Sequence, residues 1–275
     1  MIVISEQLVV AAREGDRAAL DALVRAAQRP VYNLAVRMLA DPGAAEDATQ
    51  EILIKVLTNL GSLRDPGAAG GWALRIACRH LVELRNQSRT EALRLSFKGF
   101  AQDLEEGQAP LAEAGLNATE EAIALEQVKT GCTLALLTCL SRSLRIAYVL
   151  GEIFELTDGE AASALEIAPS AFRQRLKRAR VAVLEFTRAQ CGVASARGSC
   201  HCSRRVVPAI KSGRIEIAKG ANEPPLDIQV LQTRIQTLES GRSAAALMRS
   251  NPQFEVELLP QLLQSLDHDL GQNSD

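Results

Sequence analysis

Aromatic residues and histidines are scarce in this chain of 275 residues. Phe, Trp and Tyr make up 3% of it, and its three histidines are His80, His201 and His268. No Ser/His/Asp or Glu-x-x-His constellation surrounds any of them, so no residues present themselves as catalytic machinery. Gly70-Gly71 lacks the Lys-Ser/Thr that follows the glycines of a phosphate-binding loop. We therefore expect that the protein is not an enzyme and that it requires no cofactor.

Long apolar runs are missing as well. No stretch is long enough to span a bilayer, and the N-terminus lacks the pattern of a secretion signal. Six cysteines are too few for a disulfide scaffold in a chain of this length. We expect a protein of the reducing cytoplasm, without a membrane partner. Cys78, Cys132 and Cys139 fall inside apolar helical patterns and are interpreted as small buried hydrophobic residues.

An excess of one charge is the third absence, since the formal net charge is −2. Any nucleic-acid site must therefore come from local clustering of cations. The composition, rich in Ala, Leu, Arg and Glu, favours helices with aliphatic cores and predicts an all-α fold.

Hydrophobic periodicity divides the chain into five regions. The first, 5–86, contains three predicted helices, separated by Asp41-Pro42-Gly43 and by a loop over 61–71. The third of these helices runs from Trp72 to Arg85. Its apolar face is predicted to carry Trp72, Ile76, Leu81 and Leu84. The other regions are an acidic, extended linker (87–120), a second helical domain (121–190), a cysteine-containing loop (191–225) and a helical C-terminal extension (226–275).

A helix-turn-helix is predicted inside the second helical domain. A short helix over 160–165, a turn at 167–170 and a longer helix over 170–188 have the required punctuation. The longer helix has an apolar stripe, formed by Phe172, Leu176, Ala179 and Val183. Its other side is predicted to bind DNA through Arg173, Gln174, Arg175, Lys177, Arg178 and Arg180.

The chemistry of that cationic side suits DNA. Arg bonds bidentately to guanine and Gln to adenine, while other cations neutralise phosphates. We assign Arg173, Gln174 and Lys177 to bases and the remaining three arginines to phosphates. The alternative is a solvated charged face, against which stands the absence of acids before Glu185.

Three stretches of the chain resemble a known family. DGEAASALEIAPSAFRQRLKRARVAVL (158–184) resembles DNA-binding region four of bacterial RNA polymerase sigma factors. AEDATQEILIKVL (45–57) and WALRIACRHLVELR (72–85) resemble region two. Without a third domain between them, the arrangement is similar to the compact extracytoplasmic-function (ECF) group. The resemblance covers about two thirds of the chain. It implies a protein that binds core RNA polymerase and directs promoter recognition and transcription initiation.

The resemblance also implies partners. The family docks on the beta-prime clamp and the beta flap of core polymerase and on promoter DNA, and an anti-sigma factor is a further possible partner. In such factors the clamp contact falls on the helix that here holds Asp47, Gln50 and Glu51. The linker matches the segment that threads toward the RNA exit channel, where its acidity would mimic nucleic acid.

The same resemblance assigns the two promoter contacts. The cationic helix matches the reader of the minus-thirty-five element. Trp72, Arg75, Arg79 and His80 match the segment that holds the opened minus-ten element, where an aromatic ring beside cations suits an unpaired strand. A core position is the alternative for Trp72. His80 stands where the family usually has Asn, which leaves the base preference open.

A cysteine cluster follows the cationic helix. It resembles a feature of some ECF members with C-terminal extensions, and as a Cys₃His set it is a candidate site for zinc or another thiophilic metal. The candidate ligands are Cys191, Cys200, His201 and Cys202. A redox switch is a second interpretation, because nearby Arg197, Arg204 and Arg205 would lower the thiol pKa values. The third is a loop with incidental thiols.

The C-terminal extension is predicted to be helical over 226–270. Ile228, Leu231, Ile235 and Leu238 are spaced like a short heptad seam. We hypothesise that the tail folds back on region two or region four and regulates access to polymerase or promoter. Its apolar residues include Leu247, Met248, Phe254, Leu258, Leu259, Leu262 and Leu263.

A rival interpretation is a helix-turn-helix regulator that acts without binding the polymerase core. Such proteins usually dimerise and read paired half-sites. Co-purification with core polymerase separates the two interpretations, because only the region-two resemblance predicts it.

Overall fold

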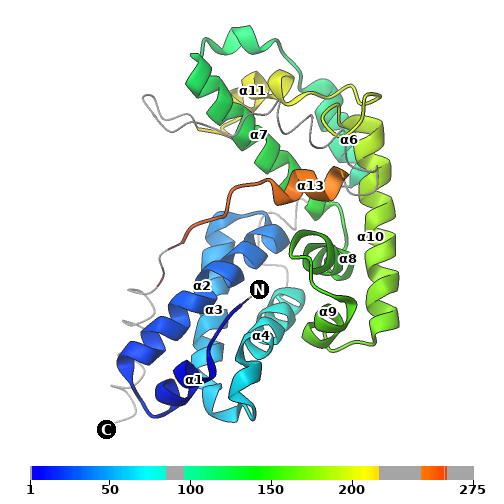
Figure 1. Ribbon diagram of the computed structural model, residues 1–275. Helices are drawn as coiled ribbons and strands as arrows, with labels where there is room; N and C mark the ends of the chain where they lie inside the picture. Colours follow the sequence, from blue (N-terminus) through cyan, green and yellow to red (C-terminus); the bar gives the residue numbers. More distant parts are fainter. Residues whose placement is uncertain (1, 85–95, 217–242, 257, 259–275) are drawn as a thin grey trace. The chain divides into compact units, whose positions relative to one another are not determined.

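The computed structural model describes residues 2–84, 96–216, 243–256 and 258 (Figure 1). Every regular element in these residues is a helix, as the sequence predicts. No helix in them is both long and apolar enough to cross a membrane. The chain divides into two compact units. Unit 1 comprises Met1–Ala92, Val149–Arg173 and Gln253–Asp275, and unit 2 comprises Leu93–Tyr148 and Gln174–Pro252.

Four helices of unit 1 come from the N-terminal region. They are α1 (Glu6–Arg13), α2 (Arg17–Leu39), α3 (Pro42–Thr58) and α4 (Ala69–Glu83). Helix α2 packs against the other three. Side chains that are almost completely buried form the core between them: Leu23, Leu34, Met38, Ile52, Leu53 and Leu81.

The predicted break between α2 and α3 is confirmed. Ala40 ends α2 in the left-handed region, at φ 53°. Asp41 then caps α3, its carboxylate accepting a hydrogen bond from the Ala44 amide at 3.0 Å, and Pro42 occupies the first helical position, where no amide donor is needed.

Helix α4 begins earlier than predicted. Gly70 and Gly71 lie in its first turn and not in a loop. A Cβ on Gly70 would lie 2.2 Å from the carbonyl oxygen of Ile2, so glycine is needed for this close approach and not as a helix breaker. The predicted apolar face of α4 is also wrong in part. Trp72 and Ile76 are only half-buried, because the buried stripe consists of Ala73, Leu74, Ala77, Cys78 and Leu81.

Unit 1 also contains the first half of the predicted helix-turn-helix. The π-helical turn η4 (Val149–Ile153) precedes α9 (Asp158–Ala164), and α10 (Pro169–Gln190) follows. A capping box starts α9, with Thr157 and Glu160 each accepting from the other's backbone amide. The helix therefore begins at Asp158, two residues before the predicted start at residue 160.

Unit 2 contains α6 (Phe97–Glu106), η3 (Leu111–Ala114), α7 (Ala118–Thr138), α8 (Arg142–Tyr148), the rest of α10, α11 (Cys202–Lys211) and α13 (Ser243–Arg249). Helix α11 lies against α7 (Figure 1). A small apolar core joins them: Ala124, Val128, Val206 and Ile215.

The predicted extended linker is wrong where the structure describes it. Residues 97–106 form α6, which buries Phe100 and Leu104. Phe100 stacks on Phe186 of α10, with ring centroids 5.3 Å apart. The polar composition concealed this apolar stripe at helical spacing. An acidic residue of this segment also pairs within unit 2, because Asp103 forms ion pairs with Arg205 (2.6 Å) and Arg214 (2.9 Å).

The C-terminal region departs from prediction in two places. Residues 202–211, predicted as loop, form α11, whose buried Val206 and Val207 give it an apolar side. Helix α13 confirms part of the predicted helical extension, but residues 251–256 are not helical. The heptad seam at 228–238 lies outside the described residues. The division into two units does not follow the family-based domain boundaries, which stay a prediction.

Candidate nucleic-acid interface

Helix α10 has the two-sided character that its sequence predicts. Phe172, Leu176, Ala179 and Val183 are all at most 3% exposed. Arg173, Gln174, Lys177, Arg178 and Arg180 are exposed, and Arg175 is half-buried. An apolar back therefore seats the helix and leaves a cationic front, which is what contact with a phosphate backbone requires.

One cation of this front already has an acidic neighbour. The Arg173 guanidinium lies 3.7 Å from the Asp158 carboxylate at the start of α9. Both side chains are about half exposed, so the pair is weak in water. Glu166, in the turn between α9 and α10, has a φ of 54°.

The four residues predicted to hold the opened minus-ten strand come together in unit 1. Trp72, Arg75, Arg79 and His80 all line one recess along α4, with Lys55 of α3 on its wall. Trp72 is half-buried, so the alternative of a core position does not describe it. The recess places a stacking ring among cations, the arrangement that suits an unpaired strand.

His80 is more deeply placed than its predicted role suggests. Its side chain is 7% exposed, and Lys55 Nζ lies 2.7 Å from its Nδ1. Because an ammonium group only donates, Nδ1 accepts and Nε2 carries the ring proton. Burial, and secondarily the charge of Lys55, lower the pKa of His80. A neutral imidazole therefore presents one N–H donor.

Two donors in this recess have no partner among the described residues. They are His80 Nε2 and Arg75 Nε, both buried atoms without a hydrogen bond. The nearest acid to His80 Nε2, the Glu51 carboxylate, is 3.6 Å away, too far for a hydrogen bond. Buried unpaired donors are costly and point to a ligand.

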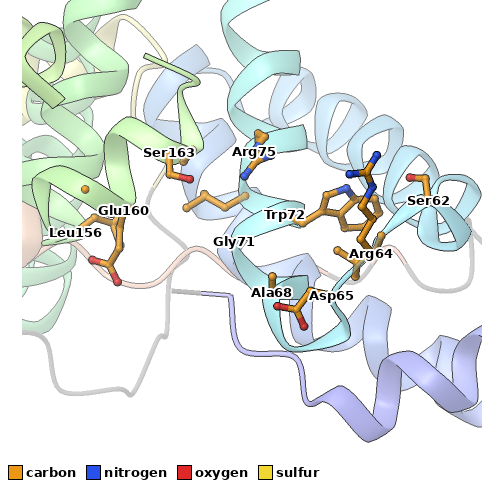
Figure 2. Close-up of a pocket in the computed structure, with 14 residues that line it drawn as sticks. Ser62, Arg64, Asp65, Ala68, Gly71, Trp72, Arg75, Leu156, Glu160 and Ser163 are labelled. Atoms are coloured by element: carbon orange, nitrogen blue, oxygen red, sulfur yellow. The ribbon is translucent and has the colours of Figure 1, made fainter. Parts of the chain in front are cut away.

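Acidic residues from the helix-turn-helix also reach α4 within unit 1. Glu166, in the turn after α9, forms an ion pair with Arg79, and this hydrogen bond raises the pKa of the Arg79 guanidinium. Figure 2 shows the adjoining pocket, in which Trp72 and Arg75 lie across from Glu160 and Ser163 of α9. The Glu166 carboxylate is thus paired with Arg79, a cation that the family resemblance assigns to a nucleic-acid strand.

The residues predicted to contact the polymerase clamp lie on α3. Asp47 and Glu51 are exposed, and Gln50 is half-buried. Glu51 is also the carboxylate that faces His80. The helix therefore presents acids outward over a buried face that includes Ile52 and Leu53, as a reversible docking surface requires.

A thiol cluster forms in unit 2 with a member that the sequence did not reveal. Cys191 and Cys200 pair as an isolated parallel bridge, in which Cys200 accepts from the Gly192 amide at 2.8 Å. Cys202 begins α11. Burial, and then the proximity of these three thiols, raise the pKa of Cys132 on α7. Its apolar helical context gave no signal, because only the packing of α11 on α7 brings it near. His201, a predicted ligand, is exposed.

The prediction that the thiol pKa values are lowered is wrong, because burial outweighs the nearby arginines. Burial raises the pKa of Cys191 and of Cys200, raises that of Cys202 to about 12, and raises that of Cys132 well above its usual value. Arg205 lowers the pKa of Cys200, but by less than burial raises it. In the described residues no three Cys, His, Asp or Glu side chains are arranged to hold a metal ion.

Comparison with known proteins finds similarity to RNA polymerase sigma factors. Residues 23–90 match the model of Sigma-70 region 2. The chain is 28% identical over 182 residues to the RNA polymerase sigma-H factor of Pseudomonas aeruginosa, covering 65% of this chain and 91% of that protein. It is 27% identical over 182 residues to the ECF RNA polymerase sigma factor SigC of Mycobacterium tuberculosis (64% and 88%). It is 35% identical over 90 residues to the ECF RNA polymerase sigma factor SigK of a Mycobacterium species, strain KMS (32% and 46%).

Proposed function

We propose that this chain, which belongs to the ECF type of RNA polymerase sigma factors, binds core RNA polymerase and directs promoter recognition and transcription initiation. The observation that carries the proposal is the recess on α4. It combines the half-buried Trp72 ring with the unpaired donors of Arg75 and His80. These groups suit an unstacked base and its backbone.

The two sites divide the work on the promoter. The recess on α4 receives the opened minus-ten strand, with Trp72 as the stacking surface and Arg75 and Arg79 beside the phosphates. The front of α10 lies on duplex DNA of the minus-thirty-five element. For Arg79 to contact a strand, the carboxylate of Glu166 must leave it.

The contacts with polymerase follow the same division. Asp47, Gln50 and Glu51 on α3 dock on the beta-prime clamp, and the second helical domain docks on the beta flap. An anti-sigma factor belongs to this proposal as a competitor for these surfaces, and the cytoplasm is its setting. The polymerase core makes the phosphodiester bonds, so the chain itself carries no catalytic step.

Run-off transcription tests the proposal. Core polymerase with the chain is expected to start at defined positions on genomic promoter fragments, including the region upstream of the chain's own gene. Trp72→Ala should abolish most of the product, and Val3→Ala, at an exposed residue that does not line the recess, should leave it unchanged. Binding to promoter duplex without binding to core polymerase would favour the rival helix-turn-helix regulator.

We propose further that the thiol cluster takes zinc or another thiophilic metal. The donor set supports this, because Cys191 and Cys200 pair through their backbones and Cys202 packs with Cys191 against the same apolar cluster. A bound cation would stabilise the thiolates and release their protons. The ligands we propose are Cys132, Cys191, Cys200 and Cys202, in place of the predicted set with His201, because His201 is exposed. In the described residues these side chains are not arranged around an ion.

A competition titration tests the metal site. The full chain, kept reduced, is titrated with Zn²⁺ against a chromophoric chelator at several pH values. One equivalent should bind, more tightly at higher pH because thiol protons are released. Cys132→Ser and Cys202→Ser should each weaken binding, and Cys139→Ser should not. Equal binding by all chains would refute the cluster.

A further inference from the structure

An extended segment of the C-terminal extension lies along α2 within unit 1. Residues 253–256 and 258 are non-helical and contact the middle of the helix. Leu258 is 2% exposed, although it lies far from the N-terminal region in sequence. The contacts are made by three polar side chains of α2 that are themselves at least nine-tenths buried: Gln28, Asn33 and Arg37.

The Asn33 side-chain amide binds the backbone of Phe254 on both sides. Its oxygen accepts from the Phe254 amide at 3.2 Å, and its nitrogen donates to the Phe254 carbonyl at 2.9 Å. Arg37 donates to the same Asn33 oxygen at 3.0 Å, which fixes the orientation of the amide, because a guanidinium only donates.

Gln28 repeats this arrangement further along the segment. Its nitrogen donates to the Val256 carbonyl, and its oxygen accepts from the Leu258 amide at 3.2 Å. A side-chain amide offers the same donor and acceptor as a peptide group. The two amides therefore pair with alternate residues of the segment as a neighbouring strand would.

Arg37 favours an aromatic side chain in the segment that lies against α2. Its guanidinium carbon lies 5.1 Å from the centre of the Phe254 ring and 5.9 Å from that of Phe154. Burial lowers the pKa of Arg37 to about 10, which shows that the cation is short of solvation. An aromatic ring supplies an attractive face to such a cation. The exposed ion pair Arg29–Glu255, at 2.5 Å, adds little.

We propose that Gln28, Asn33 and Arg37 form a peptide-binding groove on α2, that it recognises an extended segment with an aromatic residue four positions before an aliphatic one, and that residues 253–256 and 258 are its intramolecular ligand. The groove binds the backbone through two side-chain amides and the Phe254 ring through Arg37, and Leu258 is buried beside it. Any partner that presents the same pattern must displace this segment. The inference does not rest on the sigma-factor assignment, and its tests need no polymerase.

Hydrogen exchange of the full chain tests the intramolecular contact. The amides of Phe254 and Leu258 should be protected, although they lie in no helix. Asn33→Leu should accelerate exchange of the Phe254 amide about tenfold, the effect of losing two hydrogen bonds. Arg25→Ala, at an exposed position of α2, should change nothing. Unprotected amides in the unmodified chain, or unchanged exchange in Asn33→Leu, would overturn the proposal.

A labelled peptide tests recognition and guards against misfolding of the α2 variant. The peptide NPQFEVELLP, residues 251–260, is titrated by fluorescence anisotropy against full-length chains. The Phe254→Ala chain, with α2 intact and its own ligand weakened, should bind it several-fold more tightly than the unmodified chain. A peptide with Phe replaced by Ala should bind weakly. Equal affinity of both chains, or no binding to Phe254→Ala, would contradict the proposal.

Discussion

The two candidate nucleic-acid surfaces of this chain are built on opposite principles. The front of α10 is a row of exposed cations whose positions follow from one helix and its own apolar back. The recess on α4 is assembled from several elements and holds half-buried groups with unpaired donors. The first surface suits a uniform duplex, because charge alone binds it. The second suits an opened strand, because a base needs a shaped place to stack.

This difference predicts how the binding free energy is shared among the residues of each surface. Exposed cations bind many sequences with salt-dependent affinity, so each contributes a little. A recess concentrates its contribution in one ring and two or three donors. Substitutions should therefore have graded effects on α10 and a sharp effect at Trp72, unless they disturb the apolar back of α10.

The largest effect is expected from that apolar back. Phe172 is 0% exposed, and Phe172→Ala should lower the free energy of unfolding by about 3–5 kcal/mol, since it leaves a cavity. Urea unfolding followed by circular dichroism measures it. Phe172→Leu, which keeps most of the volume, should cost less than about 1.5 kcal/mol. An unchanged midpoint for Phe172→Ala would show that the stripe does not seat α10.

The next largest effect separates the recess from α10. Trp72→Ala should weaken strand opening by about 1–3 kcal/mol, the contribution of stacking to one base. Permanganate reactivity of promoter thymines reports opening, and duplex binding by the holoenzyme is measured beside it. Trp72→Phe should retain most of the opening. Equal loss of opening and duplex binding in Trp72→Ala would break the comparison.

A smaller effect is expected for any single cation of α10. Arg178→Ala should reduce the slope of log affinity against log salt by about 0.9, because one phosphate contact is lost. Filter binding of holoenzyme to the duplex at several salt concentrations gives the slope. Arg188→Ala, exposed near the end of the same helix, is the matched control and should leave the slope unchanged. A larger change of slope in Arg188→Ala than in Arg178→Ala would show that a different side of α10 faces the DNA.

The smallest effect concerns the pH dependence of stability in unit 1. The pKa of His80 is lower in the folded chain than its ordinary value near 6.5. As pH falls through about 6.5, the unfolded chain takes up this proton first, so stability is lost below that pH and is full above it. His80→Gln should remove this part of the loss. Urea midpoints at pH 7.5 and 5.5 test it, and identical pH slopes would show that His80 does not contribute.

Sequence reasoning succeeded where one element decides the outcome. The apolar stripe and cationic front of α10, the cap of α9 and the break at Asp41-Pro42 are set within a few residues of chain. Periodicity and capping express local physics, which needs no knowledge of distant residues. The family resemblance through regions two and four rested on the same local patterns.

The failures share a different cause. The predicted linker is wrong at 97–106, where Phe100 and Leu104 are buried, because only a partner such as Phe186 turns this polar segment into a packed helix. The predicted loop is wrong at Gly70, because the contact with Ile2 that requires glycine lies far away in sequence. The redox interpretation of the thiols rests on arginines that the sequence displays, whereas the burial that raises the thiol pKa values arises only in the folded chain.

The sequence by itself determined that the chain is helical and that α10 has a cationic front, and it predicted region two ahead of region four. Only the tertiary structure decided that Cys132 joins the other three thiols, that His80 is a buried neutral donor, and that Phe254 covers Arg37 of α2. The physical reason is one of range. Helix periodicity is written in neighbouring residues, whereas burial, pKa and docking depend on which distant segments displace water from each other.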